Sequence, residues 1–155
     1  MHRRAGLSLL DLTVAMLIVG IIGAVGSLKY ADALRAHRLQ GAALAISEDL
    51  RSAQHAARTR GAPVTVVFDK DAETYTITGM PNPAKPSQPF QVNVRERFGV
   101  EIKDSKFDAN KPLVINAFGN CASDKDGDIK LHIGKGKADE RTIRVRKVSG
   151  AIEAD

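Results

Sequence analysis

The sequence predicts an α+β protein in which one long N-terminal helix packs on an antiparallel β domain. Three observations predict this fold class. Residues 12–28 are apolar and carry no charge, an apolar stripe of helical period follows with no proline between Leu7 and Pro63, and the remaining chain alternates apolar and polar residues in short segments. The 155 residues, 43% of them hydrophobic and 26% charged, have room for one domain.

The first apolar segment is long enough to cross a membrane. Residues 7–28 would form a helix rising about 33 Å, which matches the hydrocarbon core of a bilayer. Arg3 and Arg4 precede it, and a positive flank is expected to stay cytoplasmic, which sends the chain after Leu28 to the far side. The far flank is basic as well, through Lys29, Arg35 and Arg38.

Asp11 interrupts this apolar segment. A carboxylate within an apolar membrane helix costs about 2.5–3.5 kcal/mol, somewhat less near an end. Such an acid points to a functional role with a specific partner that offsets the cost. The alternative is that Asp11 lies at the lipid headgroups or caps a helix that starts at Leu12.

The N-terminal segment allows two kinds of processing. An ordinary secretory signal peptide would be cut after the apolar run, where residues 24–26 and 31–33 each offer a small-x-small site. In the other interpretation, cleavage comes before the apolar run, directly after Gly6.

The segment Gly6-Leu7-Ser8-Leu9-Leu10-Asp11 resembles the class III signal of type IV pilins and type II secretion pseudopilins. That signal has a glycine, a hydrophobic residue that is usually Phe, a small hydroxyl residue, two aliphatic residues and an acid that is usually Glu. The resemblance implies that a prepilin peptidase cuts between Gly6 and Leu7 and that the new amine of Leu7 is methylated. It also implies that Asp11 pairs with the N-terminal amine of a neighbouring subunit during assembly.

An amphipathic helix is predicted from residue 29 to Arg60. Its apolar residues recur at spacings of four and three, which places them on one face. Gly61-Ala62-Pro63 ends the helix, and Arg58 and Arg60 in the last turn complement its dipole. The stripe consists of Leu39, Ala43, Ile46, Leu50, Ala53 and Ala57.

The chain after Pro63 is predicted to be β structure. Val64–Phe68 and Thr74–Thr78 flank a short polar turn and form a hairpin signal, and Met80–Pro89 is a proline-rich loop. Further half-buried strands are predicted at Phe90–Arg95, Gly99–Lys103, Leu113–Phe118, Asp128–Ile133 and Arg141–Val148.

This pattern resembles the GspH/FimT group of minor pseudopilins and type IV pilin-like proteins. Glu48–Val67 is similar to the group's Ala/Arg-rich helix end and its Arg-Gly-x-Pro-Val turn, and Phe118-Gly119, Asp126-Gly127 and Thr142–Ile152 resemble later elements. The resemblance implies a pilin-like fold with a leader peptide at 1–6, a transmembrane or filament-core half of the helix at 7–28 and a periplasmic domain at 29–155. Within that domain it implies an amphipathic helix at 29–60 and a β region at 63–155.

Cations gather near the C-terminus, and the net charge of +5 permits a polyanion partner. Arg144 and Arg146 share a strand face, which could contact DNA phosphates without sequence preference. DNA-uptake pilins of the same group carry a Gly-Arg-x-Arg element in the tail, where this chain has Gly150-Ala151-Ile152-Glu153, so a solvated strand face is favoured over DNA binding. The candidate polyanion contacts are Lys130, Arg141, Arg144, Arg146 and Lys147.

Metal and catalytic signals are weak. Asp124, Asp126 and Asp128 loosely resemble a calcium loop, but the glycine is misplaced for an EF-hand and the alternative is an Asp-Gly turn. The histidines lack metal-ligand spacing, and Cys121 has no activating neighbour in sequence. No hydrolase, phosphate-loop or dinucleotide motif occurs, so neither an enzyme nor a cofactor is predicted.

The function predicted from these features is that of a minor pseudopilin-like structural subunit of a type II secretion pseudopilus. It would be processed by prepilin peptidase and held in the inner membrane by a single span, with its C-terminal domain in the periplasm, before it assembles with other pilins or pseudopilins. Two alternatives remain: a FimT-like minor type IV pilin that binds DNA non-specifically for uptake, and a soluble exported binding protein with an ordinary signal peptide.

Overall fold

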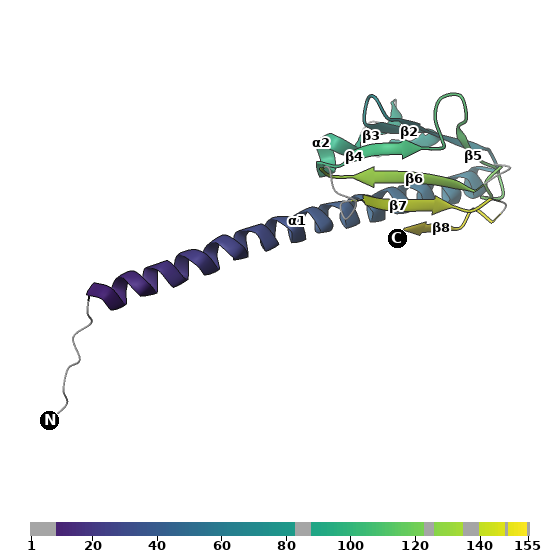
Figure 1. Ribbon diagram of the computed structural model, residues 1–155. Helices are drawn as coiled ribbons and strands as arrows, with labels where there is room; N and C mark the ends of the chain where they lie inside the picture. Colours follow the sequence, from purple (N-terminus) through teal and green to yellow (C-terminus); the bar gives the residue numbers. More distant parts are fainter. Residues whose placement is uncertain (1–8, 83–87, 123–125, 135–139, 148, 155) are drawn as a thin grey trace. The chain divides into compact units, whose positions relative to one another are not determined.

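The computed structural model describes residues 9–82, 88–122, 126–134, 140–147 and 149–154. The chain divides into two compact units, residues 1–35 and 36–155. The helix α1 (Leu9–Arg60) runs through both of them (Figure 1). The predicted long helix is therefore confirmed, and it ends at the predicted residue because Gly61 takes a positive φ of 60°. Its predicted start at Leu7 lies outside the described residues.

In the first unit, the described side chains of α1 are exposed. A window of 18 residues has a mean hydropathy of 2.3, and none of it is buried. By length and composition this part of α1 is able to cross a membrane, although a signal sequence has the same properties. Asp11 lies in the first turn of the helix.

The second unit contains two four-stranded antiparallel sheets, so the predicted α+β class and the antiparallel β domain are confirmed. The first sheet has the order β3-β2-β1-β5, and the second has the order β4-β6-β7-β8 (Figure 1). In the first sheet the strands are β1 (Val64–Asp69), β2 (Thr74–Pro81), β3 (Pro89–Asn93) and β5 (Leu113–Ile115). In the second they are β4 (Glu101–Ser105), β6 (Gly127–His132), β7 (Glu140–Val145) and β8 (Ile152–Ala154).

The core of the second unit is one apolar cluster that joins α1 to both sheets. All six residues of the predicted helical stripe are buried, and Ala42 is buried beside them. Buried and partly exposed residues alternate along β1 and β6, as expected for strands with one face on the core. The amphipathic half of α1 thus supplies the apolar surface that both sheets cover.

One predicted strand is partly wrong. Phe90–Arg95 was expected to be extended, but β3 ends at Asn93 and a short helix α2 (Val94–Phe98) follows. The Asn93 side chain accepts a hydrogen bond from the backbone N–H of Glu96 at 2.8 Å, and Gly99 ends the helix with φ of 68°. Both helix ends are therefore capped, which stabilises a helix of only five residues.

The strands after α2 also differ from their predicted bounds. β5 stops at Ile115 because the Asn116 side chain accepts hydrogen bonds from the backbone N–H groups of Phe118 and Asn120, both at 3.0 Å, and so turns the chain. The short strand β8 had no separate prediction and adds an edge to the second sheet.

Two contacts tie the sheets together beyond the core. The Glu73 carboxylate, beside β2, accepts a hydrogen bond from the backbone N–H of Ile102 on β4 at 2.6 Å. Glu73 holds a positive φ of 54°, which is uncommon for a residue with a side chain. The backbone N–H of Phe68 also donates to the carbonyl of Phe107 at 2.9 Å.

Three side chains in the last turns of α1 bind backbone carbonyls of the β domain. Gln54 donates from Nε2 to the Gly150 carbonyl at 2.6 Å, and Arg58 donates from Nε to the Phe118 carbonyl at 2.9 Å. Arg60 donates to the Gly79 carbonyl. Gln54 and Arg58 therefore bind the helix end to two loops of the β domain, and Arg60 binds it to strand β2.

Tyr75 carries a buried hydroxyl between α1 and the first sheet. Its side chain is 1% exposed, its ring packs 5.5 Å from that of Phe68, and its hydroxyl donates to the carboxylate of Asp49. Burial, and then the hydrogen bond and the negative charge of Asp49, raise the pKa of Tyr75 well above its ordinary value.

The raised pKa of Tyr75 predicts a loss of stability in alkali. The contribution of Tyr75 to the free energy of unfolding is complete below pH ~10, the ordinary tyrosine pKa. It falls as the pH rises toward the pKa of Tyr75 in the folded state, by up to about 1.4 kcal/mol per pH unit. Tyr75→Phe is expected to cost about 1 kcal/mol at neutral pH and to flatten this decline. Urea unfolding at pH 8 to 11 measures both effects, and an unchanged alkaline slope in the variant would contradict the assignment.

Candidate functional site

The predicted processing and assembly residues lie at the start of the chain. Gly6 and Leu7 fall outside the described residues, and Asp11 is exposed in the first turn of α1. Thr13 donates its hydroxyl to the Leu10 carbonyl at 2.9 Å, within the same turn. Cleavage after Gly6, methylation of Leu7 and the assembly role of Asp11 stay predictions.

The predicted polyanion contacts do not form one surface. Lys130 on β6 and Arg144 on β7 alternate with buried residues, so they occupy the outer face of the second sheet. Arg141 has the opposite parity on β7, because it shares its side of the strand with the buried Ile143. It lines a small pocket of about 200 Å³ together with Leu44 of α1.

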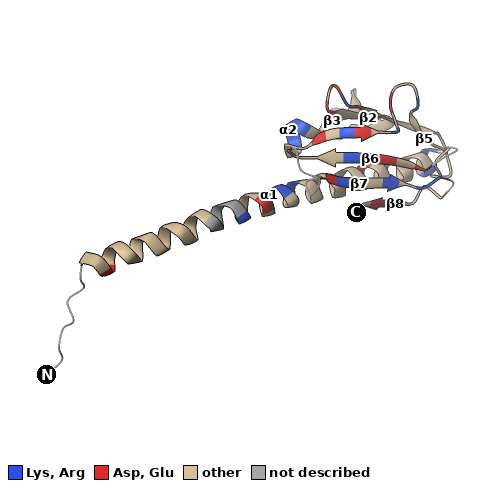
Figure 2. Ribbon diagram, viewed as in Figure 1, with Lys and Arg blue, Asp and Glu red and all other residues tan. Residues whose placement is uncertain are grey.

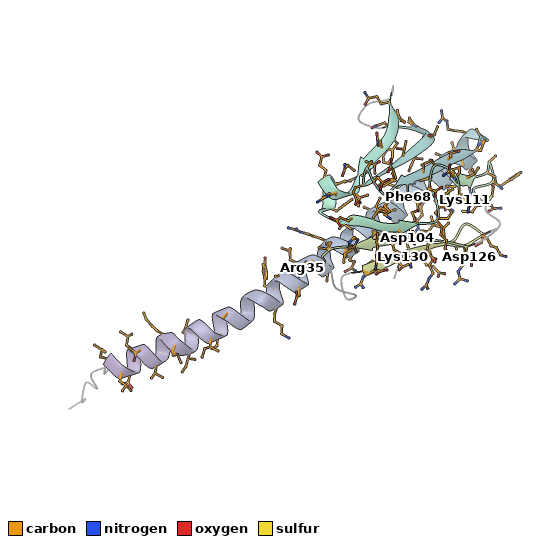
Figure 3. All side chains as sticks on the ribbon, turned by 45° about the horizontal axis from the view of Figure 1, so that its top comes forward. Arg35, Phe68, Asp104, Lys111, Asp126 and Lys130 are labelled. Atoms are coloured by element: carbon orange, nitrogen blue, oxygen red, sulfur yellow. The ribbon has the colours of Figure 1, made fainter. Side chains whose placement is uncertain are left out.

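Acidic residues are interspersed with the cations on the outer face of the second sheet, as Figure 2 shows for β4, β6 and β7. Lys103 pairs with Glu140 at 2.6 Å, and this hydrogen bond lowers the pKa of the Glu140 carboxyl. Lys130 and Asp104 are register partners on neighbouring strands (Figure 3). Further pairs are Lys106 with Asp128 at 3.3 Å, Arg146 with Glu153 at 3.2 Å and His132 with Glu101 at 3.4 Å.

This mixture of charges reduces the positive potential that a polyanion would meet. Acidic side chains on adjacent strands attract the cations and compete with phosphate for them. Arg144 lies directly across from Glu153 on β8, the acid that stands in the tail position discussed above. The face therefore has the character of a solvated, ion-paired sheet surface.

The candidate calcium residues are engaged with nitrogen donors where they are described. Asp126 accepts a hydrogen bond from the backbone N–H of Lys147 at 2.7 Å, and Asp128 pairs with Lys106. Asp124 lies outside the described residues. No group of three metal-ligating side chains occurs in the described ranges, and the weak calcium candidate is not tested further.

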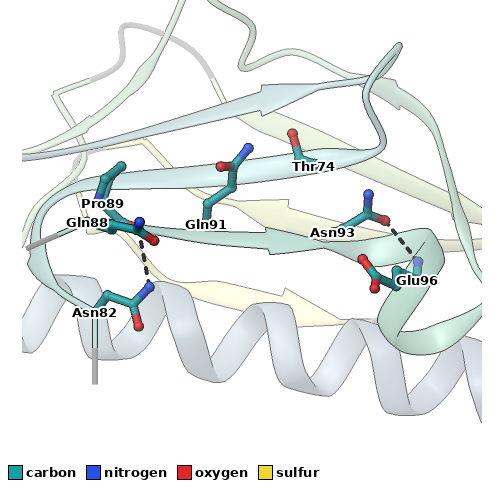
Figure 4. A pocket seen from close by; sticks show the side chains of 7 residues that line it. All are labelled: Thr74, Asn82, Gln88, Pro89, Gln91, Asn93 and Glu96. Atoms are coloured by element: carbon teal, nitrogen blue, oxygen red, sulfur yellow. Dashed lines mark hydrogen bonds between the residues drawn. The ribbon is translucent and has the colours of Figure 1, made fainter. Parts of the chain in front are cut away.

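A wide polar pocket of about 750 Å³ lies at β3, an edge strand of the first sheet (Figure 4). Two of its side chains are hydrogen-bonded to nearby backbone groups: Asn82 donates to the Pro89 carbonyl at 3.4 Å, and Asn93 caps the N-terminus of α2. Its lining offers amide and hydroxyl groups and one carboxylate, without a nucleophile next to a base. The lining residues are Thr74, Asn82, Gln88, Pro89, Gln91, Asn93 and Glu96.

Cys121 is 6% exposed, and burial raises the pKa of its thiol. A buried thiol with a raised pKa carries little thiolate and reacts slowly. This environment agrees with the sequence, in which Cys121 has no activating neighbour.

A third pocket brings together cations that lie far apart in the sequence. Arg38 of α1 and Arg95 and Arg97 of α2 line the same cavity. Nothing in the sequence pairs residue 38 with residues 95–97, because their contact depends on how α2 packs after β3.

Comparisons with known proteins show the fold. The chain is similar to the type IV minor pilin FimU of Pseudomonas aeruginosa, with a TM-score of 0.60 and 17% identity over 77% of this chain and 90% of that one. It is also similar to the minor pseudopilin EpsH from the Type 2 Secretion System of Vibrio cholerae, with a TM-score of 0.57 and 15% identity over 76% of this chain and 96% of that one. No family model and no curated protein sequence matches the chain. The predicted pilin-like fold is confirmed by these similarities.

Proposed function

We propose that this protein is a minor pseudopilin-like structural subunit of a filament assembled in the inner membrane. The observation that carries the proposal is that the two halves of α1 differ in burial. Its N-terminal half is apolar, exposed and contains the acid Asp11, whereas one face of its second half is buried against the β domain. A helix with one exposed apolar half needs a membrane or an assembly to cover that half.

In this proposal a membrane covers the apolar half of α1 first, and an assembly covers it later. The bilayer holds residues 7–28 before assembly, and the packed helices of neighbouring subunits cover them afterwards. Once the leader is removed, the carboxylate of Asp11 is attracted to the N-terminal amine of a neighbour, and the low dielectric of the filament core strengthens this charge-assisted pair. The β domain remains outside the membrane and contacts other subunits or cargo.

The mature N-terminus tests the proposal against ordinary secretion. Mass spectrometry of the protein from membranes is expected to show a chain that begins with N-methylated Leu7. A start at Ser27 or Leu34 would place the cut after the apolar run and would favour a soluble exported protein.

The alternative of a DNA-binding minor pilin draws support from Lys130 and Arg144, which share one exposed sheet face. The interspersed acids predict only weak binding of the full chain in detergent to duplex DNA. Replacing Arg144 and Arg146 with alanine is expected to change this weak affinity by less than about threefold. A tight, strongly salt-dependent complex that is lost in the double variant would instead support DNA binding.

A further inference from the structure

A pocket of about 440 Å³ lies between the second half of α1 and the helix α2. Three arginines from these two helices line it: Arg38 from α1, and Arg95 and Arg97 from α2. Figure 2 shows that α2 is mainly basic. The rest of the lining consists of Gly41, Glu96, Phe98 and Gly99.

The three guanidinium groups are held in different ways. Arg95 pairs with Glu101 at 3.5 Å, and Arg97 lies over the ring of Phe98 at 5.2 Å from the ring centroid. Arg38 reaches the C-terminal end of α2, where its Nη1 lies 3.7 Å from the position that a Cβ on residue 99 would occupy.

In the described part of the chain, neither Arg38 nor Arg97 has a carboxylate within ion-pairing distance. The residues that line the pocket, three arginines and Glu96, carry a net positive charge. An anion entering the pocket would therefore meet two guanidinium groups that no carboxylate occupies.

Gly41 is a second observation that points to this pocket. Glycine in the interior of a helix is destabilising relative to alanine, so its presence calls for a reason. A Cβ at residue 41 would meet nothing within 4 Å, and its φ is not positive, so neither packing nor backbone conformation requires glycine there. The missing side chain instead leaves open the wall of the pocket that α1 provides.

We propose that this pocket binds a phosphate group, whose source is either an anionic lipid headgroup or free phosphate. The planar fork of arginine matches phosphate oxygens with two parallel hydrogen bonds, and two arginines on different helices can grip one phosphate from two sides. Arg38 follows Leu28, the end of the proposed membrane half, by ten residues. The lipid source rests on the proposed function, whereas the anion site itself does not.

The test uses the full chain, labelled with ¹⁵N, in neutral detergent micelles. Backbone amide signals are followed while dihexanoyl phosphatidylglycerol, dihexanoyl phosphatidylcholine or inorganic phosphate is added. The amides of Gly41 and Gly99 are expected to shift saturably with phosphatidylglycerol and with inorganic phosphate, and to respond weakly to the zwitterionic phosphatidylcholine. A lower dissociation constant for phosphatidylglycerol identifies the headgroup as the source, and an equal or lower one for phosphate identifies the free anion.

Substitutions locate the binding. Arg38→Gln and Arg97→Gln are each expected to raise the dissociation constant about tenfold or more, because each removes a charge-assisted contact. Gly41→Leu is expected to abolish binding by filling the open wall. Arg51→Gln is the matched control: Arg51 is an exposed arginine of α1 that pairs with Glu48, outside the pocket, and its loss is expected to leave binding unchanged.

Three results would overturn the proposal: no saturable shift with phosphatidylglycerol or inorganic phosphate, an equal loss of affinity in Arg51→Gln, or an affinity that is unchanged in both Arg38→Gln and Arg97→Gln. Binding in detergent requires neither cleavage nor assembly. A failure here therefore leaves the proposed function standing, and an unexpected mature N-terminus leaves the anion site standing.

Discussion

The Asp11→Ala variant is expected to be cleaved normally and yet to be almost absent from filaments. The proposed filament core is a low-dielectric environment, and removing one member of a buried charge pair leaves the partner amine uncompensated there. Such a loss typically costs about 3–5 kcal/mol, which corresponds to a fall in incorporation of more than about a hundredfold. Immunoblots of sheared filaments measure incorporation, and the mass of the membrane-bound protein measures cleavage.

Two further variants make this result specific. Asp11→Glu keeps the charge and is expected to retain assembly. Asp32→Ala removes another acid of α1, one that is exposed and 3.6 Å from Arg35, and is expected to assemble like the unmodified chain. Filaments of normal abundance from Asp11→Ala would remove the role proposed for this carboxylate.

The Gly127→Ala substitution is expected to have the largest effect on stability. Gly127 is buried at the start of β6, and a methyl group on it would overlap the ring of Phe107, which covers this glycine. The ring is itself only 4% exposed and has little room to move. Overpacking of a core typically costs about 1–3 kcal/mol, and we expect a decrease of about 3 kcal/mol in the free energy of unfolding, measured by urea titration.

A matched substitution elsewhere separates crowding from the general effect of replacing glycine. Gly41→Ala adds the same methyl group where nothing lies within 4 Å, and it is expected to stabilise the protein by up to about 1 kcal/mol. Combining Gly127→Ala with Phe107→Leu should recover part of the loss, because the smaller side chain leaves room for the methyl group. Equal effects of Gly127→Ala with and without the Phe107 ring would contradict this account.

The sequence was sufficient for the features of the fold that depend on local periodicity. The spacing from Leu39 to Ala57 gave the buried face of α1 correctly, and the Gly61-Ala62-Pro63 stop gave its end. Strict alternation in residues 129–133 marked β6. Burial of one face of a helix or strand imposes these patterns on the chain. They can therefore be recognised without knowing which elements pack against that face.

The helix α2 was missed although its signals are present. Val94-Arg95-Glu96-Arg97-Phe98 suits a short strand as well as one helical turn, and so short a segment does not decide between the two periods. The deciding signals are Asn93 as an N-cap with Glu96 three residues later, and Gly99 beyond the last turn. The alternation of side chains along β7 also places Arg141 and Arg144 on opposite faces of the strand, which the sequence alone could have shown.

Other features lie beyond sequence reasoning because they join distant segments. The division of eight strands between two sheets, the ion pairs of Lys103 with Glu140 and of Lys106 with Asp128, and the pocket that unites Arg38 with α2 all depend on tertiary packing. No local pattern encodes which strand edges meet. This is why the cations near the C-terminus read as a basic patch in the sequence but form an ion-paired face in the fold.

The hydrogen bonds from Gln54, Arg58 and Arg60 to the carbonyls of Gly150, Phe118 and Gly79 have a mechanical consequence. Tension applied along α1 would load two loops and strand β2 in parallel, together with the apolar contacts of the helix. Bonds loaded in parallel share a force and break together, whereas bonds loaded in series open one at a time. The β domain is thus joined to its helix in a way that resists pulling, as the proposed role in a filament would require.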